Sequence, residues 1–296
     1  LNQARQTLAQ GRFPLVVAPE GATNNLSGEM APLEPGVAQL AFWAAEDMAK
    51  SGDPRALHVV PIGIRYSWRY PSWDLLDQRL DALDRHLGLE RHHSDDRRER
   101  LMAIGGALLS ALEQLERLKH SADRPLADRI GSYRLHGLQK AEEHFGLKAS
   151  GTLQERCRRI EQAAWDRIYR ENLDQLPPLE RSLADWEARE ADQQLTRMRL
   201  VEHFTSVSGH YVSDQPDFDR FAEMLLLVEE AIGWIEASPW NGKPCLGPQR
   251  VELNLGEALA VQPRVADYRS NRRQAVQQLT NDLEQALTEL MRARLE

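Results

Sequence analysis

The residue of this sequence best placed to do chemistry is Glu20, an acid that follows an apolar run and precedes a glycine. Residues 13–18 have the length and β-branched content of a buried strand, and Pro19 and Gly21 end that run. Ligands of α/β domains bind at the carboxyl ends of strands, so we expect a site at Glu20. The other interpretation is a loop acid that caps nearby backbone amides.

The elements around Glu20 have the pattern of an α/β domain. A loop rich in Asn, Ser, Gly and Pro follows it, and apolar residues at spacings of three and four predict a helix from about Gly36 to Lys50. Residues 58–66 read as a second strand covered on both faces. A helix between two such strands predicts a βαβ unit with parallel strands and a right-handed crossover.

Three blocks of this region resemble the glycerolipid acyltransferase family, of the 1-acyl-glycerol-3-phosphate acyltransferase type. They are P-E-G at 19–21, L-E-P-G at 33–36 and V-P-I at 60–62. The family carries F-P-E-G-T-R-S, then F-K-x-G, then V-P-I or V-P-V, in that order. The resemblance implies a core whose sheet consists mostly of parallel strands.

The resemblance also implies which residues line the site of the acceptor substrate. The substrate-binding positions that it marks are Pro19, Glu20, Gly21, Ala22, Thr23 and Asn24. The family's arginine, which grips phosphate, is Thr23 here, and threonine cannot replace its charge. Arg12 and Arg65 are the nearby candidates for that role.

The family's catalytic H-x-x-x-x-D motif is absent, because none of the nine histidines has an aspartate five residues later. A histidine of this kind removes the proton of the attacking hydroxyl, and the carboxylate orients it. We therefore expect this sequence to be the C-terminal portion of an enzyme whose His-Asp dyad lies upstream. The alternative is an inactive member of the family.

The resemblance implies transfer of a fatty acyl group to the hydroxyl of a lysolipid or of a glycerol-phosphate-type acceptor. The donor would be acyl-CoA or acyl-acyl carrier protein as co-substrate, with no metal and no further cofactor. A cytoplasmic protein peripheral to the membrane fits this reaction. The alternative function is that of an inactive acyltransferase-like protein whose helical insertion is a module for protein or membrane interaction.

Composition narrows the classes of partner and compartment. Among the 296 residues the net charge is −8, which argues against nucleic acid, since such partners require a basic surface. Two distant cysteines, Cys157 and Cys245, indicate a reducing compartment and no disulfide framework. No apolar run approaches the length of a membrane-spanning helix.

Beyond Trp73 the apolar spacing is helical for a long distance, and Thr152 with Glu155 forms a capping box before one such helix. Period-two alternation then predicts a strand at 251–255. We place that strand with the earlier ones, so 1–73 and 247–296 form the α/β core and 74–246 a helical insertion. The alternative is an independent helical domain followed by a hairpin. Residues on the helical stripes, Cys157, Trp43, Trp165, Trp186 and Trp234, are predicted core positions.

Overall fold

The computed structural model describes residues 2–21, 26–89, 95–119, 124–206, 217–236 and 244–292. The chain divides into two compact units. The first, here called the split unit, comprises residues 1–69 and 248–296, and the second, the helical unit, comprises residues 70–247. The division expected from the sequence, at 73/74 and 246/247, lies within a few residues of these boundaries.

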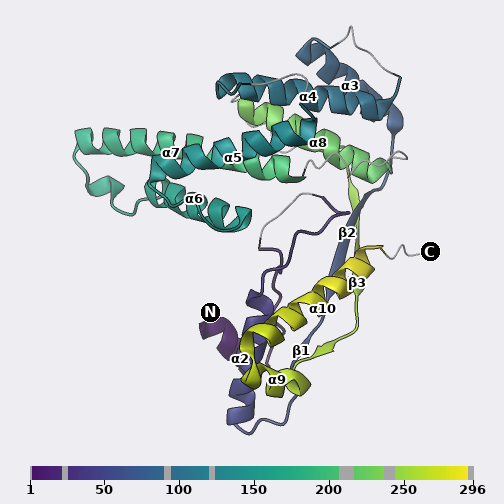
Figure 1. Ribbon diagram of the computed structural model, residues 1–296, viewed down its shortest axis with the longest axis vertical. Coiled ribbons are helices and arrows are strands. Elements are labelled where there is room, and N and C mark those ends of the chain that lie inside the picture. Colours follow the sequence, from purple (N-terminus) through teal and green to yellow (C-terminus); the bar gives the residue numbers. More distant parts are fainter. Residues whose placement is uncertain are drawn as a thin grey trace. The chain divides into compact units, whose positions relative to one another are not determined.

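The split unit combines helices with two short antiparallel pairs of strands (Figure 1). In chain order its described elements are α1 (Asn2–Gln10), α2 (Gly36–Lys50), β1 (His58–Val59), β2 (Ile62–Trp68), β3 (Gln249–Leu255), β4 (Leu259–Ala260), the 3-10 turn η3 (Gln262–Arg264), α9 (Val265–Ser270) and α10 (Arg272–Arg292). Helix α2 has the bounds that the sequence predicted.

The prediction of a parallel sheet is wrong. Strand β2 pairs with β3 and β1 pairs with β4, and both pairs are antiparallel. Residues 13–18 form no strand, and Phe13 and Val16 are 74% and 85% exposed. A strand is stabilised by cross-strand pairs, and within the described residues this run has no pairing partner. Without it, helix α2 is no βαβ crossover, and the predicted α/β class fails.

Of the predicted sheet of three strands, 13–18, 58–66 and 251–255, only the pairing of the last two is found among the described residues, and it is antiparallel. Ile62 lies opposite Leu255, and Ile64 lies opposite Leu253. Pro61 has no backbone N–H to donate, and it separates the two-residue strand β1 from β2. The amide of Gly256 donates a hydrogen bond of 2.9 Å to the Pro61 carbonyl, so the pairing continues past the end of β3.

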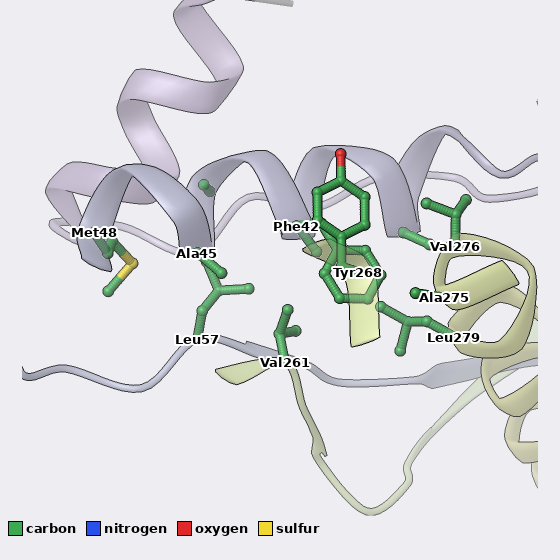
Figure 2. Packing of buried hydrophobic residues seen from close by; sticks show 12 residues of the cluster. Phe42, Ala45, Met48, Leu57, Val261, Tyr268, Ala275, Val276 and Leu279 are labelled. Atoms are coloured by element: carbon green, nitrogen blue, oxygen red, sulfur yellow. The ribbon is translucent and has the colours of Figure 1, made fainter. Parts of the chain in front are cut away.

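The core of the split unit lies between α2, α9 and α10 (Figure 2). The rings of Phe42 and Tyr268 stack with centroids 4.5 Å apart and planes 6° from parallel. The side-chain amide of Gln39 donates a hydrogen bond of 2.7 Å to the Tyr268 hydroxyl, which satisfies this polar atom of a side chain that is only 1% exposed. These contacts join residues from the two halves of the split unit, more than 220 positions apart in the chain.

The regular elements described in the helical unit are all helices, as the apolar spacing predicted. They are α3 (Trp73–Leu87), α4 (Arg97–Leu115), α5 (Leu126–Phe145), α6 (Leu153–Ile168), the 3-10 turn η2 (Leu173–Gln175), α7 (Pro178–Ser206) and α8 (Phe218–Ile235). Helices α5, α6 and α7 pack side by side around one apolar cluster (Figure 1). The predicted capping box opens α6: Thr152 Oγ1 accepts from the Glu155 amide at 3.2 Å, and Glu155 Oε2 accepts from the Thr152 amide at 2.8 Å.

Cys157 is buried in the cluster of the helical unit, as predicted. The prediction of a core position is wrong for two tryptophans, since Trp165 and Trp186 are 41% and 59% exposed. Trp165 follows the buried Ala164 and lies toward the edge of its apolar stripe. Trp186, in contrast, lies on the side of α7 away from the buried Ala184 and Ala191.

Candidate functional site

The candidate site is the loop that begins at Pro19 and leads to helix α2. Its first turn has a local reason, because Gly21 has φ +66°, a backbone conformation that glycine adopts without the steric cost of a side chain. Further along, Leu26 is buried. Of the predicted substrate-binding positions, Pro19, Glu20 and Gly21 belong to the described residues, whereas Ala22, Thr23 and Asn24 lie outside them.

Two hydrogen bonds close this loop at its base. The Glu34 amide donates to the Pro19 carbonyl at 2.8 Å, and the Ala31 amide donates to Glu20 Oε2 at 2.7 Å. The P-E-G block at 19–21 is thus bonded directly to the L-E-P-G block at 33–36 and to the residues just before it. Helix α2 starts two residues after Glu34, so the same bonds fix Glu20 relative to the beginning of α2.

The Glu20 carboxylate is half-buried, and this burial raises its pKa above the ordinary value for a glutamate. The hydrogen bond from the Ala31 amide acts in the opposite direction, because it stabilises the charged form. The second oxygen, Oε1, accepts no hydrogen bond from the described part of the chain. One oxygen is therefore held by the backbone and the other remains able to accept a hydrogen bond from a substrate hydroxyl.

The alternative interpretation of Glu20, a cap for local amides, describes one of its contacts correctly, since Oε2 accepts from the Ala31 amide. The candidate cations for an acceptor phosphate do not reach this carboxylate. Among the described residues, neither Arg12 nor Arg65 forms an ion pair with Glu20, and Arg65 lies on β2 opposite Glu252. The described loop therefore supplies a hydrogen-bond acceptor and no counter-ion for phosphate.

A buried pair that the sequence analysis missed lies in the helical unit. His203 Nε2 is 3.2 Å from Glu230 Oε2, and both side chains are only 8% exposed. The Trp234 ring lies edge-on against the imidazole, with centroids 4.5 Å apart. The two residues are 27 positions apart, and neither has a local motif, so only the helical spacing on α7 and α8 hinted at their burial. The pair joins α7 to α8, and we assign it to helix packing.

The described residues contain no cluster of three or more His, Cys, Asp or Glu side chains able to hold a metal ion. In the same residues no helix combines the length and the apolar character needed to cross a bilayer. Comparison with protein-family models, with curated proteins and with solved structures found no match. The functional assignment therefore depends on the three sequence blocks and on the loop that two of them form.

Proposed function

We propose that this chain is the C-terminal portion of a glycerolipid-type O-acyltransferase. The reaction moves a fatty acyl group from a thioester, acyl-CoA or acyl-acyl carrier protein, to the hydroxyl of a lysolipid. The His-Asp dyad that removes the hydroxyl proton lies on a segment outside this sequence. The protein works at the membrane surface, where its acceptor resides.

The observation that supports the proposal most is the closure of the loop at 19–34. Two of the three blocks by which the sequence resembles the family are 14 positions apart from Glu20 to Glu34. The Glu34 amide donates to the Pro19 carbonyl at 2.8 Å, and the Glu20 carboxylate accepts at 2.7 Å from the amide of Ala31, two residues before the second block. A shared acceptor site requires the two blocks to lie together, and this contact meets that requirement. The resemblance to the family's sheet does not support the proposal, because the strands of this chain pair in antiparallel fashion.

In this mechanism Glu20 positions the acceptor substrate. Its Oε2 is occupied by the Ala31 amide, and its Oε1 accepts a hydrogen bond from an acceptor hydroxyl next to the one that reacts. Partial desolvation strengthens that bond, because the carboxylate has fewer competing water molecules. The replacement of the family's arginine by Thr23 favours acceptors that do not depend on a bidentate phosphate contact.

The first test is the nucleotide sequence upstream of Leu1. An encoded H-x-x-x-x-D motif supports the enzyme, and an initiation codon directly before Leu1 contradicts it. The second test compares two purified proteins, residues 1–296 alone and the same chain with its encoded upstream segment. Each is incubated with a radiolabelled acyl thioester and a panel of lysolipids with and without a phosphate group. We expect product only from the longer protein, because loss of the histidine base lowers rates by about 10² to 10⁴.

One observation favours the second candidate, an inactive relative whose helical unit is an interaction module. The split unit contains as many acidic as basic side chains, so the whole net charge of −8 falls on the helical unit. An acidic surface of this kind attracts basic partners and repels anionic lipid. Absence of acyl transfer by the longer protein with all thioesters and lysolipids, despite an intact H-x-x-x-x-D motif, would favour this candidate.

A further inference from the structure

The two-stranded ribbon of β2 and β3 turns polar residues toward the helix that covers it and apolar residues outward. An antiparallel sheet that is covered on one face normally turns its apolar residues toward the cover and its polar residues toward water. Here helix α10 covers the face that carries Gly63 and Arg65 on β2 and Glu252 and Asn254 on β3. The residues of the other face alternate with these and point away from α10.

That other face, called the open face below, carries four cross-strand pairs, of which the one at its end is Trp68 with Gln249 and the other three are apolar. The three apolar pairs are Ile62 with Leu255, Ile64 with Leu253, and Tyr66 with Val251. All six side chains are apolar or aromatic, and their exposed fractions run from 41% for Ile62 to 71% for Leu255. Cross-strand neighbours on one face lie within contact distance, so the six form one continuous patch and not scattered exposed residues.

The covered face fits helix α10 closely, so the ribbon cannot turn its other face toward this helix. A Cβ atom added to Gly63 would lie 3.0 Å from Leu290 Cβ on α10, and one added to Gly256 would lie 2.8 Å from Pro61 Cγ and 3.1 Å from Leu290 Cδ1. Helix α10 therefore approaches the ribbon closely where the sequence has glycine. Within the split unit, the open face is left without a cover among the described residues.

We propose that the open face is the interface between two copies of this chain, which pack face to face about a twofold axis. A twofold interface requires a surface complementary to itself, and an uncharged strand ribbon with three apolar pairs meets that requirement. The split unit has 13 basic and 13 acidic residues, so this unit adds no net charge repulsion between two copies of the chain. Each strand of one copy would lie across the strands of the other, with Ile64 and Leu253 near the centre.

The area of the open face fits a modest dimer. If a fully exposed side chain of this size presents roughly 150 to 200 Å², the six together present on the order of 500 Å². Two copies then bury about 1,000 Å² in total, which is the lower limit for a specific interface. Because buried area does not fix the affinity, the experiment covers a wide range of chain concentration.

A lipid bilayer is the occupant that the charges disfavour. Surfaces that dock on anionic membranes combine apolar side chains with an excess of lysine and arginine. The split unit has no such excess. A second copy with the same neutral, apolar ribbon matches the open face better than an anionic lipid surface does.

The experiment is sedimentation velocity of the chain from about 1 to 100 µM, with light scattering for the mass. Leu253→Lys places a charge at the centre of the open face and, at 65% exposure, disturbs the monomer little. Leu183→Lys is the matched control, since Leu183 is an exposed leucine (54%) on α7 of the helical unit. Ile64→Thr is a second variant that keeps the β-branched shape while it adds a hydroxyl. Circular dichroism and thermal unfolding verify that each variant is folded.

We expect a concentration-dependent dimer for the parent chain and for Leu183→Lys. For Leu253→Lys we expect the dissociation constant of the dimer to increase at least tenfold, and for Ile64→Thr we expect a smaller increase. A parent chain that is monomeric up to 100 µM overturns the proposal, as does a dimer that a folded Leu253→Lys leaves unchanged. A monomer that sediments with phosphatidylcholine vesicles and loses this property in Leu253→Lys would instead assign the open face to lipid.

Discussion

The substitution Phe42→Ala tests whether the two halves of the split unit share one core. Phe42 is fully buried and stacks on Tyr268, which comes from the other half of the unit (Figure 2). Removing such a ring costs about 3 to 5 kcal/mol, the sum of its transfer free energy and the cavity left behind. An aromatic pair adds about 0.5 to 1.5 kcal/mol to its area term, so we expect a value in the upper part of this range.

The assay is hydrogen exchange followed by mass spectrometry on peptides from each unit. A loss of about 4 kcal/mol increases the opening equilibrium of the split unit by roughly three powers of ten, and α2, α9 and α10 should lose protection together. Helices α5, α6 and α7 belong to a different cluster and should keep their protection. Leu138→Ala in that cluster is the matched control, with an expected cost of about 2 to 5 kcal/mol and the opposite pattern.

Two results would refute this reasoning. If Phe42→Ala lowers protection in α2 and leaves α9 and α10 unchanged, the stacked pair does not join the two halves of the split unit. If both variants lower protection equally in all peptides, the chain unfolds as one cooperative body and the two units have no separate stability.

Three further predictions concern single side chains. Burial raises the pKa of Glu20, so the folded parent protein loses stability as the pH rises from about 4.5 and this carboxyl group becomes charged. The thermal midpoint of Glu20→Gln minus that of the parent should therefore increase over this range of pH. A difference that stays constant with pH would contradict this account. Burial raises the pKa of the Cys157 thiol to about 12, whereas Cys245 is exposed. A disulfide reagent at pH 8 should therefore react with one thiol in the native protein and with two in denaturant. Rapid reaction of both thiols in the native protein would be inconsistent with the buried position of Cys157. Thr152→Ala removes the acceptor of the capping box and should lower the free energy of unfolding by about 1 kcal/mol in a denaturant titration, whereas Thr152→Ser should lower it by less.

The sequence was most informative where local signals and packing agree. Helix α2 follows from apolar spacing between a Pro-Gly start and a Ser-Gly turn, and the structure has the predicted bounds. The capping box at Thr152 is a purely local arrangement and was found from two letters three positions apart. Period two likewise located the strand at 251–255.

The predictions that failed concern strand pairing and packing, which no short segment of the sequence specifies. Residues 13–18 have the composition of a strand, but composition does not supply a partner, and without one the run forms no strand and is largely exposed. The apolar run at 58–66 predicted a strand covered on both faces, but one face of β2 is exposed in the structure. Alternation located the strand at 251–255 without indicating which face would be covered, and the covered face of the ribbon carries glycine and charged residues. The partner of Glu20 is a backbone amide eleven residues away, and a backbone amide is present at every position except proline.

The most direct test of the proposed function measures acyl transfer by the protein that includes its upstream segment, with Glu20→Gln as the test variant. Glu257→Gln is the control, because Glu257 is an exposed acid of the same unit outside the loop. Glutamine keeps the shape of Glu20 and an oxygen for the Ala31 amide, and it removes the charge that we propose binds the acceptor. We predict that transfer from an acyl thioester to a lysolipid falls at least tenfold in Glu20→Gln at unchanged folded fraction and stays at the parent level in Glu257→Gln. Equal turnover per folded molecule in all three proteins would contradict the role of Glu20, and no transfer by the parent protein would contradict the assignment to acyl transfer.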